Sequence, residues 1–244
     1  MGHDLPQGMQ ERGYEVRTFM PKYGCINERR NQLHEVIRLS GMNLIIDDTD
    51  HPLIIKVATL QPIRMQVYFI YNEDYFQRTS DKGLETVTMA ENNDERSIFF
   101  VRSTIETVKK LRWEANLVHC QGWISALAPL YLKRVFAEDP SFRNSKIVYS
   151  LIGSRFDGCL DPRFEEKLRM EGFSDDDLAP IAGKPVDFDA LSKLAMAHTD
   201  GVVIHSPNVS PALLEYIKEK NIPCLTLQEG DDVVEKTAEF YNSL

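Results

Sequence analysis

The sequence predicts an α/β protein built on a doubly wound, mostly parallel sheet with an inserted β-meander. From Val67 onward, short apolar runs of strand character alternate with segments of helical periodicity. That alternation favours parallel strands joined by right-handed helical crossovers. Between residues 34 and 70, several β-branched runs are separated only by turn residues, which indicates a meander or hairpin.

The chain opens with a predicted helix followed by a strand. Leu5 and Met9 lie about one helical turn apart, and Gly13 supplies a helix stop, although Gly8 weakens the helix. Residues 15–21 alternate in polarity as a strand does and end in a proline. The meander strands are expected over residues 35–39, 43–46 and 53–57, followed by a more apolar strand over 65–70.

Asp47, Asp48 and Asp50 crowd the turn between two meander strands. Three carboxylates could bind a divalent cation. Their spacing is not the Asp-x-Asp-x-Asp-Gly of a calcium loop, so an acidic, solvated turn is the favoured interpretation. Farther along, residues 79–92 are polar and are expected to form an exposed loop.

A long amphipathic helix is expected over residues 95–112, capped by Asp94, because apolar residues recur at steps of three and four. Residues 117–121 then predict a buried strand, followed by a tight turn at Gly122 and a helix that Pro129 bends or interrupts. In an open α/β sheet, the carboxyl end of such a strand is where ligands bind.

The C-terminal part continues the alternation of strands and helices. Ser210 and Pro211 open one helix, with serine at the cap and proline at the first position. The other elements are expected as strands at 146–151, 199–207 and 223–227, helices at 163–170 and 188–195, a helix start at 175–177, and a closing helix capped by Asp231. All 244 residues are expected to form a single domain.

Composition argues against several classes of function. The net charge is −9, so the field of the whole protein repels phosphate backbones and anionic membranes, and neither kind of partner is expected. The four cysteines show no Cys-x-x-Cys or Cys/His spacing, which argues against a zinc site. No secretory signal or membrane-length apolar run is visible, so a cytoplasmic location is expected.

Several motifs carry a resemblance to a known family. The most specific is Val118-His119-x-x-x-Trp123-x-x-Ala126-Leu127-Ala128-Pro129-Leu130-Tyr131-Leu132-Lys133. Others are Pro21-x-Tyr23-Gly24, Asn72-x-x-Tyr75-Phe76-x-Arg78, residues 93–100 and residues 199–207. Together they resemble the N-terminal domain of the glycogen and starch synthases, which are retaining glycosyltransferases. The resemblance implies a Rossmann-like domain, the N-terminal half of a GT-B fold.

The family transfers glucose from ADP-glucose to the non-reducing end of an α-1,4-glucan, and no separate cofactor is expected. The resemblance places seven residues on the substrate side: His119, Gln121, Trp123, Asn93, Arg96, Tyr149 and Ser150. Trp123 and Tyr149 would stack on sugar rings, and His119 or Gln121 would bond hydroxyl groups. Asn93 and Arg96 would shape the acceptor side.

Structural roles are the alternative for these residues. Trp123 would be a core residue at a helix start, and His119 a strand-end histidine with its hydrogen bonds satisfied. Asn93 and Arg96 would form a helix cap and a surface ion pair.

The sequence departs from the family pattern at several positions. Gln121 and Gly122 stand where the family has a second His and an Asp, and residues 150–153 lack a sugar-site His. The first strand with its Lys-x-Gly-Gly loop, and the C-terminal donor domain with its Glu-x-Cys-Gly motif, are expected to be absent. These departures leave the catalytic residues unassigned.

Two functions therefore stay open. One is a synthase-like transferase domain acting on glycogen and a sugar nucleotide, with a partner chain that supplies the donor domain. The other is a non-catalytic glucan-binding or regulatory relative. A third interpretation, an unrelated doubly wound sheet, lacks support because no Gly-x-Gly-x-x-Gly or Gly-x-x-x-x-Gly-Lys loop occurs.

Overall fold

The structure is a computed structural model that describes residues 2–61, 63–77 and 91–244. Arg78 and most of the loop predicted over 79–92 lie outside the described residues. The elements, in chain order, are α1 (Asp4–Glu11), β1 (Thr18–Pro21), β2 (His34–Glu35), β3 (Met42–Ile46), β4 (Thr49–Leu60), β5 (Met65–Tyr71), α2 (Glu73–Phe76), α3 (Asn93–Lys110), β6 (Leu117–Gln121), the 3₁₀ helix η2 (Trp123–Ser125), α4 (Ala128–Arg134), β7 (Lys146–Leu151), α5 (Phe164–Met170), α6 (Phe188–Ala197), β8 (Gly201–Ile204), α7 (Pro211–Glu219), β9 (Cys224–Thr226) and α8 (Val233–Ser243).

The predicted α/β class and the parallel sheet are confirmed, and the described strands divide into two sheets. One is parallel throughout, with the strand order β6-β7-β8-β9. The other is mixed: β1 runs parallel to β5, while β5, β2 and β3 pair antiparallel with β4. The long β4 therefore forms the predicted meander with its neighbours.

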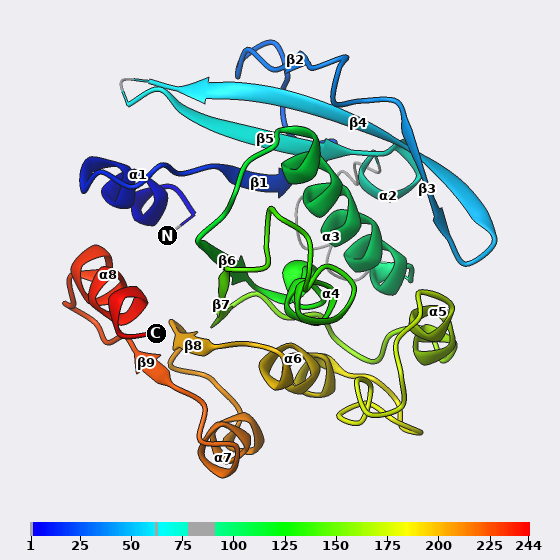
Figure 1. Ribbon diagram of the computed structural model, residues 1–244, viewed down its shortest axis with the longest axis vertical. Helices are drawn as coiled ribbons and strands as arrows, with labels where there is room; N and C mark the ends of the chain where they lie inside the picture. Colours follow the sequence, from blue (N-terminus) through cyan, green and yellow to red (C-terminus); the bar gives the residue numbers. More distant parts are fainter. Residues whose placement is uncertain (1, 62, 78–90) are drawn as a thin grey trace.

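The two sheets are joined by α3, which lies between them in Figure 1 and packs against β1, β3, β5 and η2. One face of the parallel sheet is covered by α4 and α6, which both contact β7. Most buried apolar side chains of both sheets and of these helices belong to one continuous core. The parallel strands are thus fixed in place by this one hydrophobic core.

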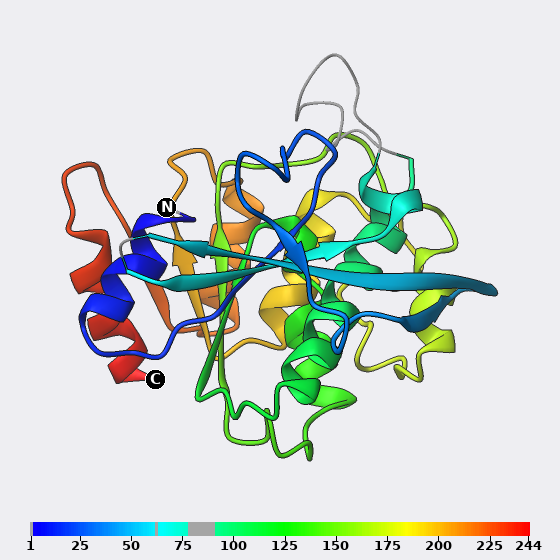
Figure 2. The ribbon, with the colours of Figure 1, turned by 90° about the horizontal axis from the view of Figure 1, so that it is seen from above.

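The N-terminal and C-terminal segments meet at one end of the molecule. Figures 1 and 2 show α1 and α8 side by side there, away from α5. Their contact has its own small apolar cluster of Leu5, Met9 and Ala238, separate from the main core. Gly8 allows α1 and α8 to approach closely, because a Cβ at that position would lie 2.5 Å from Cγ2 of Val234.

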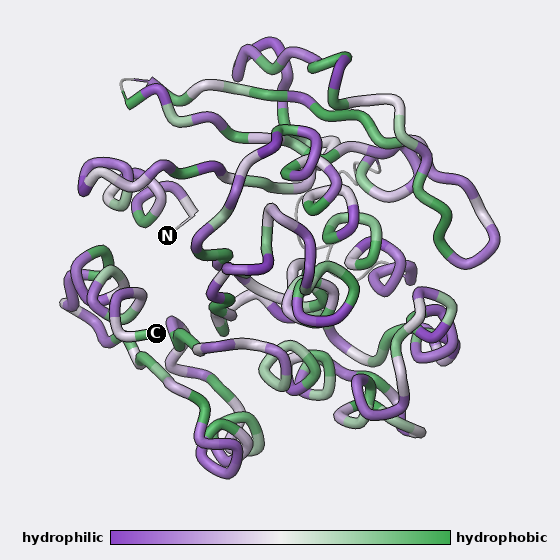
Figure 3. The backbone as a smooth tube through the Cα atoms, in the orientation of Figure 1, coloured by the Kyte–Doolittle hydropathy of each residue, from purple (hydrophilic) through white to green (hydrophobic). Residues whose placement is uncertain are grey.

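The hairpin of β3 and β4 ends in a short acidic turn at the molecular surface. Asp47 and Asp48 form the two-residue turn, and Asp47 adopts a φ of 55°, which aspartate tolerates better than most residues. Figure 3 shows the tip as hydrophilic, whereas the hairpin strands become hydrophobic toward the middle of the sheet. The acidic turn expected from the sequence is confirmed, with one carboxylate paired to Arg163.

Several predicted elements differ from the structure. The strand expected at 35–39 ends at Glu35, because the chain turns back and leaves Ile37 83% exposed while Leu39 enters the core. Asp94 is not the cap of α3: the helix starts at Asn93, and the Asp94 carboxylate binds a lysine instead. Residues 175–177 form turns rather than a helix start.

The ends of the last helices follow capping chemistry. Ser210 accepts a hydrogen bond from the Leu213 amide, as predicted from Ser-Pro at the start of α7. The closing helix is capped by Asp232 rather than Asp231, which binds Lys236 and the amide of Gln228. The prediction that Pro129 bends or interrupts a helix is wrong: α4 begins only at Ala128, and Pro129 stands in its first turn, where a missing amide proton costs no hydrogen bond.

Candidate functional site

The polar residues singled out in β6 and β7 lie on neighbouring parallel strands. His119 pairs in register with Val148, and Gln121 pairs with Ser150. Residues at matching positions of adjacent parallel strands point to the same face of a sheet. His119, Gln121 and Ser150 are therefore brought together, toward the carboxyl ends of their strands.

His119 is held by two hydrogen bonds. Its Nε2 lies 2.5 Å from Oγ of Ser150, and its Nδ1 lies 2.5 Å from Oη of Tyr241 in α8. The rings of His119 and Tyr241 meet edge-on at 5.7 Å. Burial lowers the pKa of His119 to about 3, and the nearby His205 lowers it further in the same direction. The imidazole is thus neutral at pH 7, with one nitrogen donating and the other accepting.

Gly122 shapes the turn that follows β6. Its φ is +72°, and a Cβ there would lie 2.9 Å from Cδ1 of Ile152. Both observations require glycine at the position where the family pattern has an aspartate. The preceding Gln121 is half-buried, and its side chain bonds to none of the described residues.

Three of the predicted residues belong to the core. Trp123 is 4% exposed and meets the ring of Phe156 edge-on at 5.6 Å. Tyr149 and Ser150 are fully buried. The structural alternative for Trp123 matches this position, and the indole and phenol faces are covered by protein. Their role in stacking on a sugar stays a prediction.

Asn93 and Arg96 lie in the first turn of α3 and are buried, at 5% and 2% exposed. The guanidinium of Arg96 stands 6.0 Å from the ring centroid of Phe76. Burial raises the pKa of Tyr23 to about 12, although Arg96 opposes that shift. The first turn of α3 is therefore embedded between β1, α2 and the core, and Asn93 does not act as the helix cap.

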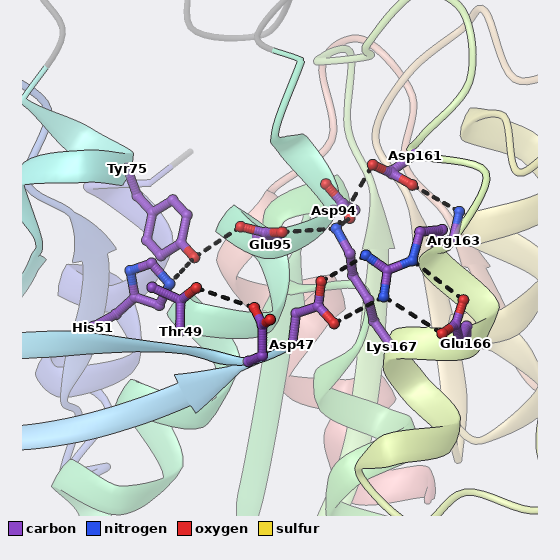
Figure 4. Close-up of polar contacts among 11 residues, drawn as sticks. Asp47, Thr49, His51, Tyr75, Asp94, Glu95, Asp161, Arg163, Glu166 and Lys167 are labelled. Carbon is purple, nitrogen blue, oxygen red and sulfur yellow. Dashed lines mark hydrogen bonds and ion pairs between the residues drawn. The ribbon is translucent and has the colours of Figure 1, made fainter.

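The same turn of α3 anchors a polar network that the sequence did not reveal. Figure 4 shows Lys167 of α5 directed at Asp94 and Glu95, with Nζ 2.7 Å from a carboxylate oxygen of each. Asp161 lies farther away, at 3.7 Å. The two nearer carboxylates outweigh the burial of the ammonium and raise the pKa of Lys167 above its usual value. The first turn of α3 is thereby fixed to α5.

The network continues from Glu95 toward the hairpin. Oη of Tyr75 donates to Glu95 at 3.0 Å and lies 2.8 Å from Nε2 of His51. Nδ1 of His51 lies 3.4 Å from Asp74. Tyr75 is 1% exposed and His51 is 6% exposed, so the phenol and the imidazole at the centre of this chain of groups are buried. It connects β4, α2 and α3 rather than forming a reactive centre.

A cavity of about 190 Å³ opens at the carboxyl ends of β7 and β8. Leu151, Phe188 and Leu213 form its apolar floor, and Arg155, Ser206 and Asn208 stand among its polar lining. This volume is below the ~300 Å³ at which pockets begin to hold drug-sized ligands, so it suits a single small ring. A larger cavity of about 370 Å³, lined by Lys109, Arg112, Glu114, Asp139, Pro140 and Ser141, lies near the amino ends of β6 and β7.

Two negative findings hold for the described parts of the chain. No group of three or more His, Cys, Asp or Glu side chains within 2–61, 63–77 and 91–244 could hold a metal ion. Over those same ranges, no helix has the length and apolar character needed to cross a membrane.

Comparisons with known proteins identify the family. Residues 1–219 match the family model of the starch synthase catalytic domain. The glycogen synthase of Chlorobium luteolum is 38% identical over 174 residues, which cover 70% of this chain and 35% of that protein. The glycogen synthase of Chlorobium phaeovibrioides is 30% identical over 238 residues, which cover 93% of this chain and 48% of that protein.

A solved structure shows the same fold. The catalytic domain of starch synthase IV from Arabidopsis thaliana, bound to ADP and acarbose, matches with a TM-score of 0.73 at 17% identity, over 94% of this chain and 47% of the other. The chain spans about a third to a half of the length of these curated relatives. Since the family model covers most of its residues, this chain belongs to the glycogen and starch synthase family of glycosyltransferases.

Proposed function

We propose that this chain forms the glucan-binding side of a glucosyltransferase that moves glucose from ADP-glucose to an α-1,4-glucan such as glycogen. The observation that carries the proposal is the polar set of His119, Gln121 and Ser150 toward the carboxyl ends of β6 and β7, in a chain of this family. Neutral imidazole, amide and hydroxyl groups are suited to bond sugar hydroxyls. The cavity at the carboxyl ends of β7 and β8 is lined by none of these three residues, so the proposal does not depend on it.

Transfer itself requires more than this set of residues. Charge that develops on the departing diphosphate must be met by fixed cationic groups. Among the described residues, no Lys or Arg side chain bonds to His119, Gln121 or Ser150, and Gly122 replaces the aspartate of the family pattern. We infer that the chain alone does not transfer glucose and that a partner chain supplies the donor-binding groups. No cofactor is proposed, since the sugar nucleotide would be the donor substrate, and the proposed compartment is the cytoplasm.

A non-catalytic glucan-binding or regulatory protein is the second candidate. The observation in its favour is that Gly122, whose backbone and surroundings require glycine, stands where the family pattern has an aspartate. In this case the chain would bind glycogen without a partner chain, and adding a partner chain would not produce glucose transfer.

Two assays on the purified chain test these functions. Retardation by glycogen in a native gel, weakened in His119→Ala and Gln121→Ala, would support glucan binding. Incubation with labelled ADP-glucose and glycogen should leave glycogen unlabelled. Label above the background without protein would overturn the inferred inactivity. If the gel shows no retardation and the glycogen carries no label, both proposed functions are ruled out.

A further inference from the structure

A tyrosine hydroxyl of the C-terminal helix α8 forms a hydrogen bond with His119, the residue predicted to bind sugar. Oη of Tyr241 lies 2.5 Å from Nδ1 of His119, across 122 positions of sequence. The other nitrogen of the same ring is bonded to Ser150. A sugar hydroxyl would therefore find no free nitrogen on His119 while α8 is docked.

The docking of α8 is peripheral. Only Thr237 and Ala238 of this helix are buried, and its apolar cluster with α1 is separate from the main core. Segments with few buried apolar contacts open at a lower free energy than the whole fold. Figure 1 shows α8 at the edge of the molecule, beside α1 and the end of β8. Opening of α8 therefore does not require the parallel sheet to unfold.

The fit beneath α8 depends on one glycine in β8. A Cβ on Gly201 would lie 2.8 Å from Cζ of Phe240 and 3.1 Å from Leu244. The aromatic end of α8 thus lies directly against the sheet face that carries His119. The helix covers this face closely although only two of its residues are buried.

A second histidine, His205, also lies beneath α8, and its ring nitrogens form no hydrogen bond with the described residues. His205 directly follows β8, and its backbone amide bonds to Leu151 of β7 at 3.0 Å. Both of its ring nitrogens are shielded from solvent and have no hydrogen-bond partner among the described residues. Buried polar atoms are rarely left unpaired in native proteins, so this arrangement calls for a further partner.

We propose that Tyr241 is an intramolecular competitor whose phenol hydroxyl occupies, on His119, the position of a ligand hydroxyl. When α8 moves away, His119, Ser150 and the unpaired His205 form a neutral, hydroxyl-binding site. The proposal takes a carbohydrate as the ligand class from the glucan-binding function, since imidazole and hydroxyl groups both donate to and accept from sugar hydroxyls. The proposal rests on the glucan-binding function proposed above.

Tyr241→Phe tests the competition, since it removes the hydroxyl and keeps the ring that packs on the sheet. The dissociation constant for glycogen, measured by affinity electrophoresis, should fall by about 3- to 10-fold, which corresponds to the loss of one competing hydrogen bond. Lys236→Ala is the matched control, because Lys236 lies on the same helix but bonds to Asp231. The control should leave the dissociation constant unchanged.

Hydrogen exchange supplies the second measurement. Glycogen should raise amide exchange in residues 233–243 of the unmodified chain. Val234→Ala, which loosens the contact with Gly8 without touching His119, should tighten glycogen binding in the same direction as Tyr241→Phe. Val234→Ala also replaces Tyr241→Phe if that variant fails to fold.

The outcomes separate the two proposals. Glycogen binding that depends on His119, with neither variant tightening it and with α8 equally protected, would overturn the competition alone. Absence of glycogen binding in the unmodified chain and in both α8 variants would overturn the glucan-binding function and the competition with it.

Discussion

The ammonium of Lys167 and the carboxylate of Asp94 form an ion pair of 2.7 Å, with side chains 4% and 1% exposed. The two residues are 73 positions apart and connect α5 to the first turn of α3. Glu95 shares the same ammonium and accepts a hydrogen bond from Tyr75. A buried pair of this kind adds little net stability, but removal of one partner leaves a charge uncompensated.

Replacement of Lys167 by methionine is therefore expected to destabilise the fold by about 3–5 kcal/mol. The methionine has a similar length, so the loss would come from the unpaired carboxylates of Asp94 and Glu95 rather than from a cavity. Urea denaturation followed by circular dichroism would measure the free energy of unfolding. A loss no larger than that of Lys236→Met, in a more exposed pair with Asp231, would contradict the prediction.

Trp123→Ala should cost about 3–5 kcal/mol of stability, because a buried aromatic side chain is removed from its contact with Phe156. Trp123→Phe should cost less, since it retains a ring at the same place. Thermal unfolding of both variants measures this difference. If Trp123→Ala weakened glycogen binding while its melting temperature stayed unchanged, the residue would act on the ligand rather than in the core.

Local sequence signals predicted most elements of the chain. The β-branched run at 146–151 coincides with β7, and Ser210 with Pro211 marks the start of α7. These elements follow from periodicity and capping, which act over a few residues. The strand expected at 35–39 failed because the turn back toward β4 outweighed its β-propensity.

The site was predictable only where a motif carried it. His119, Gln121 and Ser150 were predicted and lie on adjacent strands. The partners of Lys167 and Tyr241 had no local signal, because each side chain bonds to a residue more than 70 positions away. Such contacts depend on how helices dock, which periodicity does not specify.

Gly8→Ala should loosen α8, although alanine favours a helix over glycine by about 1 kcal/mol. The added Cβ would lie 2.5 Å from Val234, so α8 must shift to accommodate it. Amide exchange in residues 233–243 is expected to rise. In the double variant Gly8→Ala/Val234→Ala, the added methyl group fits against a smaller partner, and protection should return. Unchanged exchange in the single variant would show that the contact is not tight.

Acid should destabilise the protein through its two covered histidines. Burial lowers the pKa of His119 to about 3 and that of His205 to about 4, whereas both titrate near 6.5 in an unfolded chain. The unfolded state therefore binds more protons between about pH 6.5 and pH 4, so the free energy of unfolding falls as the pH falls through that window.

His205→Leu isolates one of the two groups, since its ring nitrogens have no partner that the substitution would strand. Urea denaturation between pH 7 and about pH 4 should show a smaller loss of stability in this variant than in the unmodified chain. The same loss in both proteins would mean that His205 becomes protonated in the folded state, and the neutral, hydroxyl-binding character assigned to it would be wrong.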